Sequence, residues 1–200
     1  MATVIAEMSM SLDGFVADPC DRVGPLFDWY GNGDVEVPTA FPERWTFRTS
    51  KASARYLTES MDKISALVAG RRLFDVGGWG ENGQPWGVPV FVVTHSVPEG
   101  WPRDDAPLPF TFVTDGVDSA VQKAKATAGD GWVGVAGPNI AQQCLNAGLL
   151  DEIRINLVPV LFGEGIRYFG SLSNAMLALE GPSVIEGTGV THLCYRVKKG

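Results

Sequence analysis

The chain has 200 residues, of which 45% are hydrophobic and 20% are charged, a composition typical of a globular protein with a buried core. The formal net charge is −7, so nucleic acids and anionic membranes are poor partners, and any bound phosphate must be held by local donors against the overall field. No stretch of the sequence looks like a linker, and this predicts one domain over residues 1–200.

Targeting and metal signals are weak. The N-terminus lacks the basic region and long apolar run of a signal peptide, and no apolar run reaches membrane-spanning length. Cys20, Cys144 and Cys194 lie far apart without a C-x-x-C pair, which argues against a disulfide framework and a zinc site. These features predict a cytoplasmic protein that holds no metal and binds neither membrane nor nucleic acid.

Apolar strand patterns alternate with helical patterns along most of the chain. The expected strands are Thr3–Met10, Ile64–Gly70, Val88–Thr94, Phe110–Thr114, Trp132–Ala136, Glu152–Val160 and a final hairpin of Leu177–Glu186 and Val190–Lys198. The expected helices are Lys51–Met61, Arg72–Val76, Val117–Ala128 and Asn139–Ala147. This order predicts an α/β fold whose sheet is parallel in the middle and antiparallel at its C-terminal edge.

Several residues are expected to shape these elements. Ser50 and Asp115 are candidate N-caps of the helices that follow them, and Gly148 is a natural left-handed end for the last helix. Ala52, Tyr56 and Leu57 are predicted to face inward from the first helix. The segment Glu152–Val160 alternates apolar and polar residues, which predicts a strand with one polar face.

The segment Asp18–Thr49 is the least regular part of the sequence. It is rich in turn-forming residues and also carries Trp29, Tyr30, Phe41, Trp45 and Phe47, so it is too aromatic for a disordered loop. One interpretation is an ordered excursion that covers a pocket mouth or a partner subunit. The other is a loop whose only role is packing, and the sequence does not choose between them.

The segment Val133–Leu145 is an apolar strand that turns through Gly137 into a helix. Free backbone N–H groups and the dipole at the start of a helix both favour negative charge, so this turn is a candidate anion site. The residues Ala-Gly-Pro-Asn at the turn do not match the G-x-G-x-x-G fingerprint, and many helices follow strands without binding anything. Both interpretations stay open for this turn alone.

Two further polar turns follow predicted strands. Gly70 is followed by Arg71 and Arg72, whose planar guanidinium groups suit a phosphomonoester. Thr94-His95-Ser96 ends the next strand, and in a parallel sheet such strand ends share the edge where ligands gather. The simpler alternative in each case is a set of solvated surface residues.

The first predicted turn and the missing motifs bear on chemistry. Asp13-Gly14 is a turn signal after the first strand, and Asp13 is either a candidate catalytic carboxylate or a side chain that bonds its own turn.

The sequence has no G-x-S-x-G, H-E-x-x-H or Walker lysine motif. Of the two histidines, His192 falls inside the last strand and is interpreted as structural. A reaction whose difficult step is supplied by a cofactor, such as hydride transfer, fits this inventory.

Five segments, in this order, resemble the reductase domain of bacterial riboflavin biosynthesis, the RibD C-terminal domain, which shares the dihydrofolate reductase-like fold. They are Met8–Ala17, Val68–Phe74, Val90–His95, Val135–Gln143 and Val158–Phe169. The resemblance implies a three-layer α/β fold with a mixed, mostly parallel central sheet and an antiparallel C-terminal hairpin. It also implies NADPH as cofactor, a small-molecule substrate and a homodimer.

The resemblance also implies where the cofactor binds. It places the pyrophosphate on the helix start after the strand ending at Ala136, the phosphates on the two basic or polar turns, and the nicotinamide carboxamide on the backbone after Phe15. The implied cofactor-binding residues are Val16, Ala17, Gly70, Arg71, Arg72, Thr94, His95, Ser96, Ala136, Gly137, Pro138, Asn139 and Ile140. The candidate catalytic residues are Asp13 and Glu164, the latter within the late glycine loop Gly163-Glu164-Gly165.

The sequence also departs from the related families. Dihydrofolate reductases have a cis Gly-Gly bond where this chain has Ala136-Gly137, and they carry an early helical carboxylate for the pterin that has no equivalent here; Asp34, Glu36 and Glu43 stay unplaced. The H-x-E and P-C-x-x-C motifs of the deaminase usually fused to the riboflavin enzyme are absent, so no deamination is expected.

The sequence thus predicts an NADPH-dependent reductase that transfers hydride to a C=O or C=N group of a small heterocyclic or sugar-derived substrate, similar to 5-amino-6-(5-phosphoribosylamino)uracil reductase. The alternatives are a dihydrofolate reductase proper and a non-catalytic nucleotide-binding protein.

Overall fold

The computed structural model describes residues 1–173 and 177–198. Its main sheet is built from β1 (Thr3–Ser11), β5 (Ile64–Gly70), β6 (Val90–Val93), β7 (Phe110–Val113), β8 (Trp132–Ala136), β9 (Glu152–Val158), β11 (Leu179–Glu186) and β12 (Thr191–Val197). The helices are α1 (Lys51–Lys63), α2 (Arg71–Val76), α3 (Trp79–Asn82), α4 (Val117–Ala128), α5 (Pro138–Asn146) and the 3-10 helix η1 (Gly24–Tyr30). Two small sheets pair β2 (Phe15–Ala17) with β10 (Ile166–Arg167) and β3 (Val35–Val37) with β4 (Phe47–Thr49).

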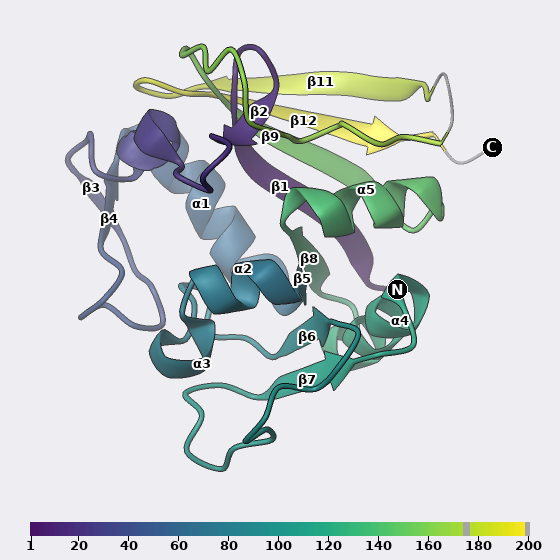
Figure 1. The fold of residues 1–200 in the computed structure, drawn as a ribbon. Helices are drawn as coiled ribbons and strands as arrows, with labels where there is room; N and C mark the ends of the chain where they lie inside the picture. Colours follow the sequence, from purple (N-terminus) through teal and green to yellow (C-terminus); the bar gives the residue numbers. More distant parts are fainter. Residues whose placement is uncertain (174–176, 199–200) are drawn as a thin grey trace.

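The eight-stranded sheet has the order β11-β12-β9-β1-β8-β5-β6-β7. All neighbours from β9 to β7 are parallel, and only the hairpin β11–β12 and its pairing with β9 are antiparallel. Figure 1 shows the hairpin at the top of the sheet and β6 and β7 at the opposite end. The predicted mixed sheet with an antiparallel C-terminal hairpin is therefore confirmed.

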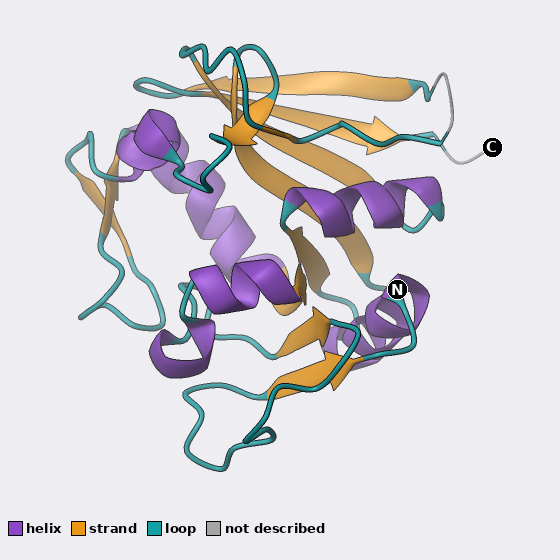
Figure 2. Ribbon diagram, viewed as in Figure 1, coloured by secondary structure: helices purple, strands orange, loops and turns teal. Residues whose placement is uncertain are grey.

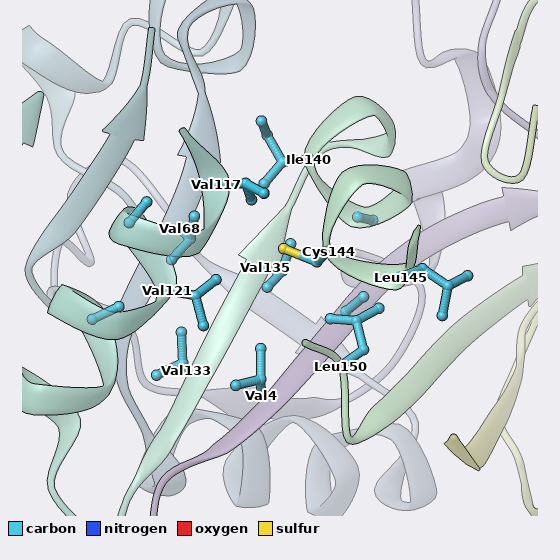
Figure 3. Close-up of a cluster of buried hydrophobic side chains, with 14 of the residues drawn as sticks. Val4, Val68, Val117, Val121, Val133, Val135, Ile140, Cys144, Leu145 and Leu150 are labelled. Atoms are coloured by element: carbon cyan, nitrogen blue, oxygen red, sulfur yellow. The ribbon is translucent and has the colours of Figure 1, made fainter. Parts of the chain in front are cut away.

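Helices cover the sheet on both sides, so the fold has three layers (Figure 2). Helices α4 and α5 pack on one face, where alternate residues of β8 and β5 meet the apolar side of each helix (Figure 3). Val68, Val121, Val135 and Cys144 are all within 2% of complete burial in this cluster. Period-two alternation in the strands and the apolar stripes of the helices explain why these residues meet.

The other face of the sheet changes character along its width. Beside β5 and β6, helices α2 and α3 bury an apolar, aromatic cluster that includes Phe74 and Trp79. Beside β1, β9 and β12, the strands present polar side chains, and α1 and η1 cover them. The predicted polar face of β9 is therefore not solvated: Arg154 is 6% exposed and Asn156 is 1% exposed.

The excursion over residues 18–49 is ordered and packs on α1 and the end of β9. Its 3-10 helix buries Leu26 and Trp29 against Tyr56 and Leu57 of α1. This packing accounts for the aromatic content of the segment. Neither a partner subunit nor a pocket is needed to explain it, although both interpretations of its function stay open.

Local details differ from the sequence expectations in two places, the start of α4 and the inward face of α1. Ser50 caps α1 as predicted, because its hydroxyl accepts a hydrogen bond from Ser53 N. Asp115 does not cap α4, because the N-cap is Gly116, with φ of 101° and no side-chain cap. The Asp115 carboxylate instead accepts a hydrogen bond from Lys123 Nζ at 3.5 Å. Ala52 is only half-buried, while Ser53 and Ala54 point inward with Tyr56.

Candidate functional site

The three predicted strand-end turns meet along one edge of the sheet. Strands β8, β5 and β6 are parallel neighbours, with Ala69 opposite Ala136 and Gly70 opposite Val93. The chain leaves these strands at the same level, into α5, into α2 and into the turn at 94–96. The prediction that these turns share one edge of the sheet is confirmed.

The start of α5 offers backbone donors to this edge. Gly137 is the N-cap, with φ of 92° and ψ of 141° and no side-chain cap, and Pro138 occupies the first helical position. Within an α-helix the next two amides, those of Asn139 and Ile140, have no backbone acceptor. The first intrahelical bond runs from Ala141 N to Gly137 O, at 3.1 Å. Two uncapped N–H groups and the helix dipole therefore converge here.

The start of α2 lies directly against the start of α5. A Cβ added to Gly70 would lie 3.2 Å from Ile140 Cγ1, and one added to Gly137 would lie 3.7 Å from Leu73 Cδ2. The glycines thus allow the two turns to approach closely. A ligand resting on the α5 amides would also reach the side chains at the start of α2.

Arg71 and Arg72 both pair with carboxylates on the surface. Arg71 Nε lies 2.8 Å from Asp75 one helical turn away, and Arg72 is bonded to Asp21 of the excursion. The hydrogen bond and the charge of Asp21 raise the pKa of Arg72 above its usual value. The side chain of Arg72 is 72% exposed, so water screens this pair and a phosphate can compete for the guanidinium.

The turn after β6 is held by its own side chain. The Thr94 hydroxyl donates to Ser96 O at 2.9 Å and accepts from Ser96 N at 3.4 Å. His95 and Ser96 are exposed. The turn therefore presents a small polar surface next to the start of α2.

The backbone of β2 is fixed by the late glycine loop. Val16 and Ala17 are buried. Strand β10 pairs antiparallel with β2, with Ile166 opposite Ala17. A Cβ on Gly165 would lie 2.1 Å from Ala17 O, so only glycine permits this approach. Glu164 is exposed on the same loop, and the structure therefore brings Glu164 beside the predicted nicotinamide-binding backbone.

Asp13 joins the first turn to this glycine loop. Its carboxylate accepts hydrogen bonds from the Ser11 hydroxyl at 2.6 Å and from Gly163 N at 2.7 Å, and it is also bonded to Phe162 N. The Ser11 bond, followed by the backbone bonds, lowers the pKa of Asp13 to about 2. Asp13 is thus a carboxylate at neutral pH, and its contacts suit positioning of the loop rather than proton donation.

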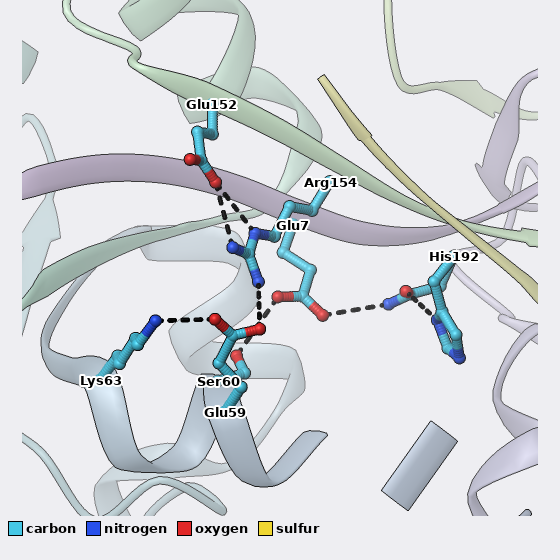
Figure 4. A network of polar contacts seen from close by, with 8 residues as sticks. Glu7, Glu59, Ser60, Lys63, Glu152, Arg154 and His192 are labelled. Atoms are coloured by element: carbon cyan, nitrogen blue, oxygen red, sulfur yellow. Dashed lines mark hydrogen bonds and ion pairs between the residues drawn. The ribbon is translucent and has the colours of Figure 1, made fainter. Parts of the chain in front are cut away.

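A buried polar network under α1 was not anticipated (Figure 4). Glu7 accepts hydrogen bonds from Asn156 Nδ2 at 3.2 Å and from the Ser60 hydroxyl at 3.3 Å. Asn156 Oδ1 and the Ser53 hydroxyl bond the two ring nitrogens of His192, at 2.7 and 2.9 Å. The sequence signal for this network is the polar residues at alternate positions of otherwise apolar strands. That signal does not reveal which helix covers them.

His192 and Trp29 complete the network. Burial lowers the pKa of His192 to about 4, so the ring is neutral, with Nδ1–H donating to the Asn156 carbonyl oxygen and Nε2 accepting from Ser53. Trp29 Nε1 donates to the Ser9 hydroxyl at 3.0 Å, and its ring meets His192 edge-on. These contacts agree with the structural role expected for His192.

The Ala136–Gly137 bond departs from the cis geometry of dihydrofolate reductases. Within residues 1–173 and 177–198, cis peptide bonds precede only Pro102 and Pro182. The bond before Gly137 is therefore trans. Among the described residues, no helix has both the length and the apolar character needed to cross a membrane.

The architecture is that of dihydrofolate reductase-like proteins. A dihydrofolate reductase from Enterococcus faecalis, solved in complex with NADP(H), superimposes with a TM-score of 0.57 at 15% identity, over 98% of this chain and 97% of that one. A Shewanella sp. PV-4 protein assigned to riboflavin biosynthesis gives a TM-score of 0.69 at 24% identity over the whole of both chains.

A third solved structure carries the reductase as part of a longer protein. The Thermotoga maritima diaminohydroxyphosphoribosylaminopyrimidine deaminase/5-amino-6-(5-phosphoribosylamino)uracil reductase gives a TM-score of 0.62 at 12% identity, over 98% of this chain and 57% of that one. The family model of the RibD C-terminal domain matches residues 2–188. The chain therefore belongs to the RibD C-terminal domain family, a family of reductases.

Proposed function

We propose that this protein is an NADPH-dependent reductase that delivers hydride to a C=O or C=N group of a small heterocyclic or sugar-derived substrate. The observation that carries the proposal is the junction of the α5 start with the α2 start on one edge of the sheet. It joins uncapped backbone donors to the guanidinium groups of Arg71, which is half-buried, and Arg72, which is exposed, the combination that a nucleotide with several phosphates requires.

The residues of this edge fit NADPH in chemical type. The amides of Asn139 and Ile140 suit the pyrophosphate, while Arg71 and Arg72 suit the 2′-phosphate, with the Thr94–Ser96 turn beside them. The fixed backbone at Val16 and Ala17 suits a planar carboxamide. This assignment is supported by the E. faecalis dihydrofolate reductase, a similar fold that binds NADP(H).

NADPH would supply the hydride, and the protein would hold the acceptor carbon close to it while excluding water. Asp13 fixes the loop that carries Glu164, through its bonds to Phe162 N and Gly163 N. Because its pKa is about 2, we assign Asp13 a positioning role. Glu164 remains the candidate for substrate contact, and water is the candidate proton source.

The binding test compares NADPH with NADH in wild type, Arg72→Gln and the matched control Arg103→Gln. Arg103 is also an ion-paired arginine, held by Glu81 and Asp105, but it lies outside the proposed edge. Loss of one charge-assisted contact of about 1.5–3 kcal/mol should weaken NADPH about 10- to 150-fold. Arg103→Gln should leave NADPH binding unchanged, and equal losses for NADPH and NADH in Arg72→Gln would contradict the assignment.

A turnover test addresses the alternative of a non-catalytic nucleotide-binding protein. NADPH oxidation is followed with a panel of acceptors that includes 5-amino-6-(5-phosphoribosylamino)uracil-type substrates and dihydrofolate. We expect oxidation with a 5-amino-6-(5-phosphoribosylamino)uracil-type acceptor and none with dihydrofolate. We further propose that the protein is cytoplasmic, as its three free cysteines favour, and that it forms a homodimer, as the family resemblance implies. Light scattering of the purified protein tests the homodimer.

A further inference from the structure

The ion pair between Asp21 and Arg72 joins two parts of the proposed cofactor edge. Arg72 is the second residue of α2, and Asp21 belongs to the turn of residues 18–22, which directly follows β2. Arg72 Nε donates to both carboxylate oxygens of Asp21, at 3.1 Å each, and Nη2 also donates to Oδ2. Asp21 therefore occupies one side of the guanidinium group that is proposed to bind the 2′-phosphate.

Hydrogen bonds within the turn of residues 18–22 hold Asp21 in this place. The Asp18 carboxylate accepts from Cys20 N at 2.7 Å, from Arg22 N at 3.0 Å and from Arg22 Nε at 2.7 Å. Asp18 N donates to Arg22 O at 2.9 Å, and Asp21 N donates to Asp18 O at 3.1 Å. The turn is thus closed by its own residues, and it carries the Asp21 carboxylate from the end of β2 to the start of α2.

The backbone of Asp21 is left-handed. Its φ is 64°, and no other non-glycine residue in 1–173 or 177–198 has a positive φ. Aspartate adopts this conformation more readily than most residues, but the conformation still costs free energy relative to an extended or right-handed backbone. Strained residues cluster at ligand-binding sites, where the direction of a side chain matters. Here the strained residue directs its carboxylate to Arg72.

Both arginines at the start of α2 already have an anionic partner. Arg71 Nε donates to both carboxylate oxygens of Asp75, at 2.8 Å each, so the two pairs together carry no net charge. A 2′-phosphate carries about two negative charges at pH 7, and at Arg72 it would be repelled by Asp21. The side chain of Asp21 is 26% exposed and that of Asp75 is 49% exposed, so water screens Asp21 less.

We propose that Asp21 competes with the 2′-phosphate of the cofactor for Arg72 and thereby reduces the preference of this protein for NADPH over NADH. The inference rests on the proposed function, because it takes Arg72 to be a phosphate contact. When NADPH binds, Asp21 releases Arg72 Nε and Nη2, and the turn of residues 18–22 separates from α2. NADH has a hydroxyl group in place of the phosphate, and carboxylates accept hydrogen bonds from that hydroxyl in NAD-binding proteins, so the Asp21–Arg72 pair stays intact.

The test measures the Kd of NADPH and of NADH by fluorescence titration for wild type, Asp21→Asn and the control Asp105→Asn. Asparagine keeps the size of the side chain and tolerates the same left-handed backbone, so the turn should keep its conformation. Removal of one negative charge beside the phosphate should tighten NADPH about five- to tenfold, while the Kd of NADH stays within about twofold of wild type. Asp105 pairs with Arg103 outside the proposed edge, so Asp105→Asn should change neither Kd.

A second measurement follows the turn itself. In NMR titrations of the wild-type chain, NADPH should shift the amide signals of Cys20, Asp21 and Arg22 more than NADH does, because only NADPH displaces the carboxylate from Arg72. Equal shifts with the two nucleotides would overturn the inference.

The affinities of Asp21→Asn decide between the inference and its alternatives. Weaker NADPH binding would overturn the inference, because it would show that Asp21 holds Arg72 ready for the phosphate. Unchanged NADPH affinity, or equal gains for NADPH and NADH, would overturn it as well. In each of these cases wild type still binds NADPH, so the proposed function stands. If wild type binds neither nucleotide, the proposed function fails and this inference fails with it.

Discussion

Gly137→Ala is the substitution that most directly perturbs the start of α5. The residue has φ of 92° and ψ of 141°, a conformation that L-residues rarely adopt. The space around it is sufficient, because the nearest atom to an added Cβ would be Leu73 Cδ2 at 3.7 Å. The substitution therefore acts through backbone strain of about 1–3 kcal/mol, not through a steric clash.

The strain has two measurable consequences. For a chain of this size it should lower the Tm by about 2–12 °C, at about 2–4 °C per kcal/mol. If the backbone relaxes to relieve it, the amides of Asn139 and Ile140 turn away from their ligand. Loss of one such bond to a charged phosphate, about 1.5–3 kcal/mol, should raise the Kd for NADPH about 10- to 150-fold.

Gly148→Ala is the matched control at the other end of α5. Gly148 also has a positive φ, 68°, with no atom within 4 Å of an added Cβ, so it should cost about 1–2 kcal/mol of stability. NADPH affinity should stay at the wild-type value in this control. Calorimetry gives both Tm values and fluorescence titration gives both Kd values. The reasoning is refuted if Gly137→Ala is destabilised yet binds NADPH like wild type.

Three further predictions concern stability. Asp13→Asn should lower the Tm at pH 7 and leave it equal to that of wild type near pH 2. The fold lowers the pKa of Asp13 from 3.8 to about 2, so the carboxylate stabilises the fold above pH 3.8 and this contribution disappears as the pH falls toward 2. Equal Tm values at pH 7 would contradict this. The pKa of His192 is lowered from 6.5 to about 4, so wild-type stability should fall as the pH drops from 6.5 to 4, and His192→Gln should show a flatter profile in the same urea titrations. Ser9→Ala leaves the buried Trp29 Nε1 unpaired and should cost about 1–3 kcal/mol in urea unfolding, whereas an unchanged midpoint would show that the bond contributes nothing.

Regular elements were predictable wherever the sequence pattern is local. The strand Trp132–Ala136 and the helix Val117–Ala128 have the predicted bounds, because their periodicity and flanking glycines are read directly from the chain. The strand expected over Val88–Thr94 is shorter, Val90–Val93. Pro89 lacks the N–H that a longer ladder would need.

The proposed cofactor edge was predictable for the same reason. Turns that follow parallel strands share an edge whatever their side chains, so Arg71 and Gly137 could be placed together before the sheet order was known. The side-chain partners were not predictable. Asp21 reaches Arg72 from 51 residues away, a distance over which no sequence pattern specifies a contact.

The polar network under α1 depended on packing. The alternation in β9 predicts a polar face, but burial of Arg154 and Asn156 depends on α1 and η1 lying over that face. Likewise, Asp13 was expected to bond its own turn or act in catalysis. Its bonds to Phe162 N and Gly163 N, 149 and 150 residues away, arise only when β2 and the late glycine loop come together.

The most direct test of the account is a crystal structure of the protein with NADPH. We predict that the pyrophosphate lies within hydrogen-bond distance of the Asn139 and Ile140 amides, with the 2′-phosphate against Arg71 or Arg72. A nucleotide bound elsewhere, or one whose phosphates contact neither the start of α5 nor these arginines, would contradict the proposed reductase site.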